Sequence, residues 1–268
     1  IQLSDNISNN SPDVNVLGKL IFSNNHYIEG EDDISAALPG LSQFRLYDLG
    51  EIQNQNGGSL LTSTHNSSAC LRGFANYFFE PLCNITLIGG STYSLPSELD
   101  SVGNLFIDGA GVISTSQNLV INGTLNTQGK FHFNHRLTIN GSSIIDAGII
   151  TNGSNAELHY RSAITPQFIP EDITSLKQLK VDVSNPSPWG AVYFNENLSI
   201  TSANGLILSH GHLNSNNDSL FLLNDAPVSG STNSLVNATV VIDVATTSSA
   251  SYEYISFPVG TAYHGYQP

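Results

Sequence analysis

The sequence predicts an all-β protein whose larger part is a parallel β-solenoid. Three observations carry this prediction: turn-forming residues are abundant, short β-prone runs recur, and helical periodicity is almost absent. The chain of 268 residues contains 29 Asn and 23 Gly, two residue types that tolerate positive φ and therefore occupy turns. So many turn formers require many short strands between them, which is the pattern of a β protein.

A short motif repeats from about residue 100. Segments 104–109, 118–123 and 136–141 each hold two alternating apolar residues followed by Asn-Gly or Asp-Gly, and 197–202 is a weaker copy. Other strand-like segments intervene, which favours a solenoid in which each copy forms the same edge of successive coils, with Leu and Ile stacked inward. A ladder of hairpins with type I′ turns, or an antiparallel β-sandwich, is the alternative.

The chain divides into two expected regions, a less regular β cap over 1–100 and a repetitive solenoid over 101–268. A cap is expected because an open first coil exposes unpaired edge groups. The best short helix candidates are 33–38 and 170–179, although either could be a single turn in a loop. Further strands are expected at 156–160, 176–183, 191–194, 198–200, 205–208, 219–223 and 236–244.

The charge balance excludes several classes of partner. Only 11% of residues are charged, and 8 Lys and Arg face 22 Asp and Glu, for a formal net charge of −14. Nucleic acids and anionic membrane surfaces bind basic proteins, so neither is an expected partner. No apolar run approaches the roughly 20 residues of a membrane span.

Divalent cations are the charged partners that an acidic chain attracts. The acidic group Glu29, Glu31, Asp32 and Asp33 is the candidate Ca²⁺ site, because Ca²⁺ prefers hard oxygen ligands. A hydrated acidic loop is the simpler interpretation. No other cofactor is expected.

The two cysteines, Cys70 and Cys83, flank an aromatic stretch. In an exported protein this spacing predicts a local disulfide, which would stabilise the fold by about 3 kcal/mol. Two buried thiols are the alternative. A zinc site is not expected, since two cysteines without a suitably spaced His pair do not supply four ligands.

Motifs of known catalytic chemistry are absent. The sequence lacks the nucleophile elbow, the zinc-protease helix, the P-loop, the dinucleotide fingerprint and the EF-hand loop. A polysaccharide lyase or hydrolase on a β-helix is the enzymatic alternative, but this is analogy from fold. The strand-borne carboxylates that hydrolysis would need in pairs are scattered through the sequence, at Asp108, Asp146, Glu157 and Asp182.

Two groups of histidines are candidates for binding. His210 and His212 would share one face of a continuous strand and could meet one metal ion. His132, His135 and Arg136, with Lys130 beside them, could line a groove that binds an anionic sugar. Exposed side chains on a solvated strand are the simpler interpretation of both groups.

The only Trp, Trp189, and the nearby Tyr193 are the candidate glycan contacts. An exposed aromatic ring in this position could stack on a sugar. Packing against a loop corner is the alternative.

The repeats resemble the repetitive surface proteins of Bacteroidota that are exported by type IX secretion. The resemblance covers about 100–268 and rests on the stacked Asn-Leu-x-Ile-x-Gly units, on 156–160 followed by 176–186, on 205–213 followed by 219–224, and on 256–260. It implies adhesin-like proteins without catalytic residues. Because the last motif leads into further sequence in that family, the chain is expected to be a fragment. The start at Ile1 likewise predicts the removal of a signal peptide or upstream region.

The expected function is therefore structural or adhesive. We expect a non-enzymatic, extracellular segment of a secreted cell-surface protein that binds glycan or another surface ligand, or associates with itself. A self-assembling extracellular filament subunit is the alternative, followed by a polysaccharide-binding or polysaccharide-degrading β-helix.

Overall fold

The structure is a computed structural model. It describes residues 7–8, 13–23, 26–30, 43–55, 59–62, 69–141, 143–146, 148–161, 166–183, 190–202, 205–224, 226–231 and 234–242. Within these ranges every regular element is a β-strand and neighbouring strands pair in parallel. The fold is a parallel β-solenoid, as predicted, and the hairpin ladder and the antiparallel sandwich are both wrong.

The chain forms two compact units, Ile1–Gly153 and Ser154–Pro268. The first contains β1 (Ile7–Ser8), β2 (Asp13–Val16), β3 (Lys19–Phe22), β4 (Ile28–Glu29), β5 (Gln43–Leu46), β6 (Glu51–Asn54), β7 (Leu61–Thr62), β8 (Leu71–Arg72), β9 (Asn76–Phe79), β10 (Asn84–Ile88), β11 (Tyr93–Ser94), β12 (Ser101–Val102), β13 (Leu105–Asp108), β14 (Val112–Thr115), β15 (Leu119–Ile121), β16 (Thr124–Thr127), β17 (Lys130–Phe133), β18 (Arg136–Ile139), β19 (Ser143–Asp146) and β20 (Ile149–Asn152).

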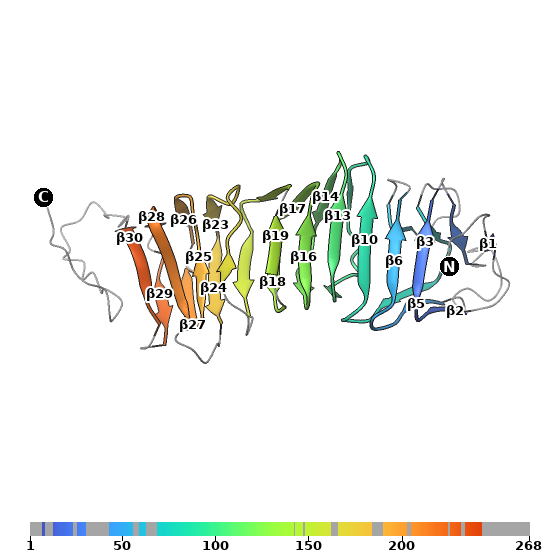
Figure 1. Cartoon of the computed structure of the whole chain (residues 1–268), viewed down its shortest axis with the longest axis horizontal. Helices are drawn as coiled ribbons and strands as arrows, with labels where there is room; N and C mark the ends of the chain where they lie inside the picture. The colour runs from blue at the N-terminus through green and yellow to red at the C-terminus, as the bar shows by residue number, and fades with distance from the viewer. Residues whose placement is uncertain are drawn as a thin grey trace, which may run out of the picture. The chain divides into compact units, whose positions relative to one another are not determined.

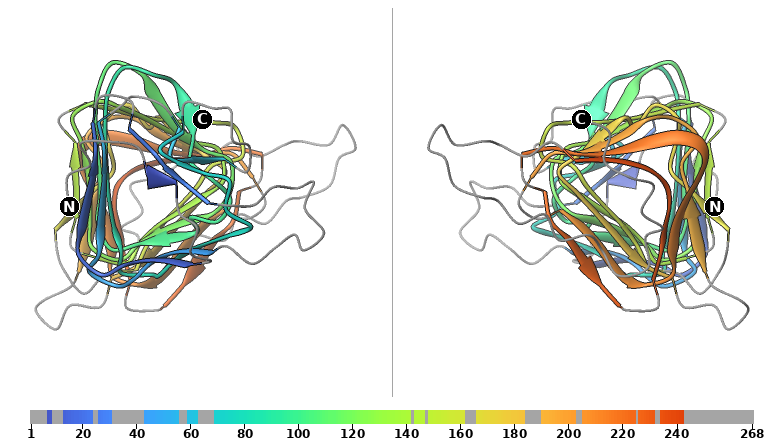
Figure 2. Two further views of the ribbon diagram at one scale, coloured as in Figure 1. Left: turned by 90° about the vertical axis from the view of Figure 1, so that its right-hand side faces the viewer. Right: turned by 90° about the vertical axis from the view of Figure 1, so that its left-hand side faces the viewer.

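Most coils of the first unit contribute one strand to each side, but the coil between β6 and β10 contributes both β7 and β8 to one sheet. The longest sheet has the order β19-β16-β13-β10-β6-β3, and its strands lie side by side in Figure 1. In the later coils the other two sides are β11-β14-β17-β20 and the paired strands β12, β15 and β18. In the earlier coils they are β2-β5-β9 and β1-β4-β8-β7. Seen along the stack, these strands trace a three-sided path (Figure 2).

Burial alternates along the strands, because successive side chains point to opposite faces. Five consecutive coils place a buried apolar residue at one register position, and each such residue stacks on the next. Burying one side chain of this kind contributes about 1.5–3 kcal/mol. The five residues are Leu20, Ile52, Ile85, Leu105 and Leu125.

The register explains the uneven spacing of the sequence motif. Leu119 pairs with Leu137, so the copies at 118–123 and 136–141 stack directly, as predicted. The copy at 104–109 instead forms β13, on another side of the coil, and its next-coil partner is β16. The weaker copy at 197–202 forms β26, in a sheet with β23 and β28. The prediction that all copies form one edge is therefore wrong for the first and fourth copies, because every side of the coil has the same alternating pattern.

Asn and Gly occupy the corners between the sides. Asn104 donates from its side-chain amide to Oδ1 of Asn84 at 2.7 Å, and its own Oδ1 accepts from the backbone N–H of Thr124 at 2.8 Å. At another corner, a Cβ on Gly109 would collide with the backbone oxygen of Gly89, and the φ of Gly109 is 155°. The corners thus use Asn to link coils and Gly to let them approach.

The second unit contains β21 (Glu157–Tyr160), β22 (Gln167–Phe168), β23 (Ser175–Leu176), β24 (Gln178–Asp182), β25 (Ala191–Tyr193), β26 (Leu198–Ile200), β27 (Leu206–His210), β28 (His212–Leu222), β29 (Val228–Gly230) and β30 (Val236–Ile242). One side of its coil is β21-β24-β27-β29. The rest is a sheet in which the long strand β28 pairs with both β25 and β26, and then with β30.

The helix expected over 170–179 is absent. Pro170 lies before a turn at Glu171 and Asp172, and Ser175–Leu176 and Gln178–Asp182 are strands that pair with their neighbours. Pairing with adjacent coils thus prevails over the local helix signal. The other helix candidate, 33–38, lies outside the described residues. In the part of the chain that the structure describes, no helix has the length and apolarity needed to span a membrane.

Candidate functional site

The predicted disulfide is wrong, because both cysteines are free, buried thiols. Cys70 directly precedes β8, and its Sγ donates to the backbone oxygen of Leu60 at 3.1 Å. Cys83 directly precedes β10, which belongs to a different sheet. Burial raises the pKa of both thiols. For Cys83, burial and a smaller contribution from the nearby Asp48 carboxylate raise the pKa to about 12. Both groups therefore stay protonated and unreactive at neutral pH.

The strands place the four predicted carboxylates at separate positions. Asp108 lies on β13 and Asp146 on β19 of the long sheet in the first unit, with β16 between them. In the second unit, Glu157 pairs across strands with Gln178, whereas Asp182 pairs with His210 at the far end of its strand. In the described ranges, no three His, Cys, Asp or Glu side chains cluster as a metal site would require.

The two histidines His210 and His212 do not share a strand face. His210 ends β27 and His212 begins β28, with Gly211 at a φ of 94° forming the corner between the two strands. His210 is exposed and its Nδ1 lies 2.7 Å from Oδ1 of Asp182. His212 is buried, its Nδ1 accepts from the backbone N–H of Leu235 at 3.0 Å, and burial lowers its pKa.

The basic group around residue 132 is spread over a strand and a turn. Lys130 and His132 lie on β17, where Nδ1 of His132 is 3.0 Å from Oγ1 of Thr151 on β20. His135 lies in the following turn and Arg136 begins β18 on the next side of the coil. An anionic sugar site formed by these residues stays a prediction.

Of the proposed acidic Ca²⁺ group, only Glu29 is described. Its carboxylate lies 3.5 Å from Nε of Arg72, whose guanidinium lies over the ring of Tyr27 at 3.1 Å. This carboxylate is thus already neutralised by a cation from the same sheet. Glu31, Asp32 and Asp33 lie outside the described residues.

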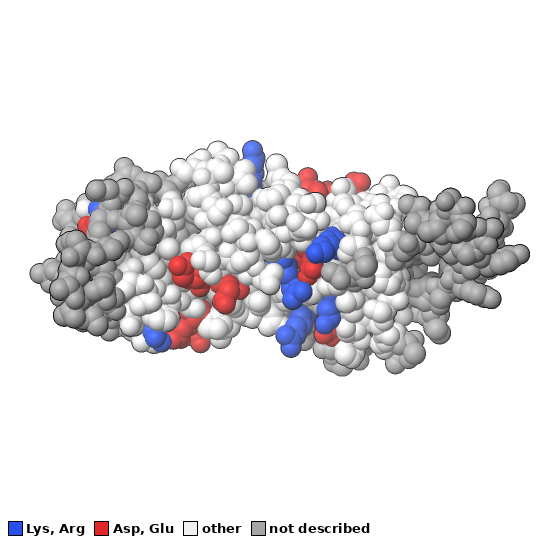
Figure 3. Space-filling view, turned by 180° about the vertical axis from the view of Figure 1, so that it is seen from behind, with Lys and Arg blue, Asp and Glu red and all other residues white. Residues whose placement is uncertain are grey.

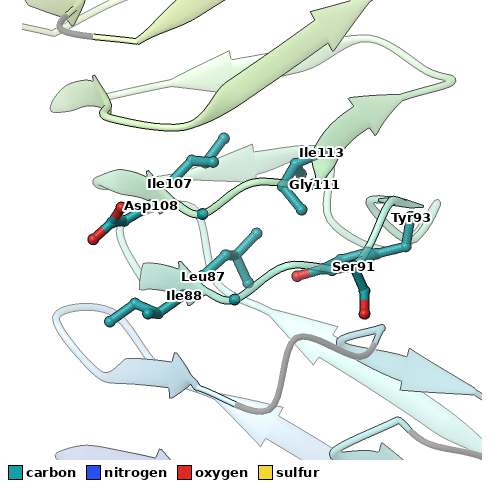
Figure 4. Close-up of a pocket in the computed structure, with 10 residues that line it drawn as sticks. Leu87, Ile88, Ser91, Tyr93, Ile107, Asp108, Gly111 and Ile113 are labelled. Atoms are coloured by element: carbon teal, nitrogen blue, oxygen red, sulfur yellow. The ribbon is translucent and has the colours of Figure 1, made fainter.

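A small pocket lies where two successive corners of the first unit stack (Figure 4). Leu87 and Ile107 face it, while Ile88 and Asp108 point to the opposite side of their strands. The pocket thus has mainly apolar walls and no pair of facing carboxylates. The residues that line it are Leu87, Ile88, Gly89, Ser91, Tyr93, Ile107, Asp108, Gly109, Gly111 and Ile113.

Charged side chains are sparse on the surface. Figure 3 shows one face of the molecule on which small groups of acidic and basic residues interrupt a largely uncharged surface.

An aromatic pair stands out on the outer face of the second unit. Phe168 on β22 and Tyr193 on β25 are register partners, and their rings stack with centroids 5.5 Å apart and planes 28° apart. The next partner of Tyr193 is Asn214 on β28, and Asn214 pairs with Asn237 on β30. These four residues form one outward column, which we call the aromatic column.

Hydrogen bonds hold the backbone of the aromatic column in place. The buried side chain of Tyr160 donates from Oη to the backbone oxygen of Phe168 at 2.6 Å. The backbone N–H of Ile169 donates to the oxygen of Tyr193 at 2.8 Å. Phe168 remains 48% exposed, so a large apolar ring faces water on a fixed strand.

Sequence reasoning found Tyr193 but missed Phe168, which lies 25 residues earlier with an irregular connection between them. Only the strand register could have revealed the pair. Trp189, the other predicted glycan contact, lies outside the described residues. No protein-family model, curated protein or solved structure matches the chain.

Proposed function

We propose that the chain is a non-enzymatic structural segment of an extracellular cell-surface protein, and that it holds an adhesive face in a fixed geometry. The observation that carries this proposal is the continuous register of a buried column in the first unit. In the first unit, one column runs from Leu20 to Leu125 over five coils. A stack of this kind repeats one side chain per coil at the strand spacing of about 4.8 Å, and it is stiff because every coil is bonded to the next.

The polar surface supports an extracellular setting. Only 11% of residues are charged, while the chain contains 29 Asn. The two thiols are compatible with an oxidising exterior, because burial keeps them protonated and out of reach of disulfide exchange.

A self-assembling filament subunit is the second candidate, and strand β30 is the observation that favours it. Within the described residues β30 pairs only with β28. A sheet edge of this kind can accept a strand from another chain. Electron microscopy of the native material would separate the two candidates: fibres with a regular axial repeat favour the subunit, and dispersed particles favour the segment.

Labelling of intact cells tests the proposed location. A membrane-impermeant, amine-reactive biotin reagent would be applied to cells that produce the native protein, whose Lys130 is exposed. The proposal predicts equal labelling before and after lysis, while a cytosolic control protein is labelled only after lysis. Labelling of the chain that requires lysis would contradict it.

A further inference from the structure

We propose that the aromatic column of the second unit binds a neutral, extended polysaccharide of β-1,4-linked hexopyranose residues. This inference rests on the proposed adhesive function and names its ligand class. The column runs across the strands, from Phe168 through Tyr193 and Asn214 to Asn237. A ligand that contacts all four must therefore extend along the stacking direction.

The spacing of the rings suits such a chain. Adjacent strands lie about 4.8 Å apart, and the ring centroids of Phe168 and Tyr193 lie 5.5 Å apart. This distance is close to the length of one hexopyranose residue in an extended polymer. An equatorial β-1,4 linkage keeps consecutive sugar rings in a flat ribbon, so that neighbouring residues can lie over neighbouring coils.

The chemistry of the column also suits a sugar. The ring planes are 28° apart at a separation that requires an offset, so part of each ring face is not covered by the other ring. A chain that runs along the column meets the outer edges of the two rings and the uncovered parts of their faces, and the apolar C–H groups of a pyranose can pack on both. The carboxamides of Asn214 and Asn237 follow in the same column, and each offers both a donor and an acceptor to sugar hydroxyls.

The charge around the column selects a neutral ligand. The column itself carries no charged side chain, and the turns that follow its first two strands expose Glu171, Asp172 and Glu196. These carboxylates can accept hydrogen bonds from hydroxyls but repel uronic acids and sulfated sugars. The formal net charge of −14 acts in the same direction.

Calorimetric titration of the whole chain with four oligosaccharides tests the inference. The neutral probes are cellohexaose, mannohexaose and the hexamer of N-acetylglucosamine, and hexagalacturonate is the anionic control. We expect at least one neutral hexamer to bind and hexagalacturonate not to bind. Failure of all three neutral hexamers, or equal binding of hexagalacturonate, would overturn the inference.

Substitution of the exposed ring locates the site. Phe168→Ala is expected to weaken binding about tenfold or more, because it removes the exposed apolar ring on which the sugar packs. Phe78→Ala is the matched control, since Phe78 is also an exposed strand residue, 39% against 48% for Phe168, but lies in the first unit. The control should bind as the unchanged protein does. Asn214→Ala keeps the aromatic pair and should weaken binding by a smaller factor.

Two outcomes would assign the aromatic column another role. Unchanged binding by Phe168→Ala would place the sugar elsewhere and overturn the inference. Concentration-dependent dimerisation in sedimentation experiments that Phe168→Ala abolishes would show that a second copy covers the column, and would overturn it too. Surface labelling of intact cells does not depend on the column. If the protein is labelled on intact cells but binds none of the oligosaccharides, only this inference is overturned. If the protein is not labelled on intact cells, the proposed function is overturned.

Discussion

The side chains of Asn84 and Asn104 are joined across one coil by a hydrogen bond of 2.7 Å, donated by Nδ2 of Asn104. The same asparagine also accepts the backbone N–H of Thr124 in the following coil. Asn122 and Asn140 repeat the link at another corner, with Nδ2 of Asn140 as donor at 2.9 Å. The richness in asparagine thus has a structural cause, since backbone ladders end at the corners and amide side chains continue the bonding there.

Asn104→Ala should lower the free energy of unfolding by about 1–2 kcal/mol, because it removes two hydrogen bonds between coils. Asn76→Ala on β9 is the control, since Asn76 is exposed on a strand and should change stability by less than about 0.5 kcal/mol. Urea unfolding of both variants gives the comparison. Equal stability of the two would mean that the asparagine links contribute nothing measurable.

Gly109→Ala should destabilise the first unit by about 2 kcal/mol or more, because the new Cβ meets the backbone oxygen of Gly89 and Gly109 has a φ of 155°. Gly90→Ala is a matched control at the neighbouring corner, where a Cβ would have no atom within 4 Å. Thermal unfolding of the two variants provides the measurement. A loss of stability by Gly90→Ala as large as that of Gly109→Ala would refute the close approach of the coils.

Leu119→Ala should cost roughly 2–5 kcal/mol, because Leu119 is fully buried and stacks on Leu137. Ile139→Ala, in the same pair of strands, should cost a similar amount. Val120→Ala is the control, because Val120 lies next to Leu119 on β15 but points outward, and this substitution should cost much less. If denaturant unfolding gave less than half a kcal/mol for both Leu119→Ala and Ile139→Ala, the assignment of the inward face would be wrong.

Stability should fall as the pH rises above about 9. Burial raises the pKa of Cys83 to about 12, whereas an unfolded thiol ionises near about 8.5. Below the unfolded pKa both states hold the proton, so the stabilisation is fully present there. At higher pH the unfolded state loses its proton while the folded state keeps it, and stability declines until the folded pKa is reached.

Cys70, Tyr93 and Tyr160 act in the same direction, because burial raises the pKa of each. Urea midpoints measured between about pH 7 and pH 11 should therefore decrease, and Cys83→Ala should reduce the slope. A midpoint that stays constant over this range would contradict the burial of these groups.

Much of the coil could be predicted from sequence, because the inward alternation of Leu119, Ile121, Leu137 and Ile139 is local. The side of the coil on which each strand lies could not be predicted, since β13 and β15 carry the same motif on different sides of one coil. The number of residues per coil also varies, which makes the repeat of the earlier coils hard to see in the sequence. The register partners Ile52 and Ile85 are 33 residues apart, whereas Leu105 and Leu125 are 20 apart.

The candidate sites were harder to predict for the same reason. The spacing of Cys70 and Cys83 suits a disulfide, but the two residues adjoin strands of different sheets. His210 and His212 have the spacing of strand neighbours, yet a glycine corner separates them. The pairing of Phe168 with Tyr193 depends on the number of residues in the segment that connects them, and no local sequence pattern determines that number.

The most direct test of the stacked coil is the pattern of amide contacts around β15 in solution. Nuclear Overhauser measurements on deuterated protein would examine Leu119–Ile121, whose partners in the parallel stack are Leu137–Ile139. The parallel stack predicts contacts between the amide of Val120 and the amides of the residues next to Thr138, one coil later. Contacts between Leu119–Ile121 and Thr124–Thr127 in an antiparallel pattern would show a hairpin at Asn122-Gly123 and would contradict the solenoid.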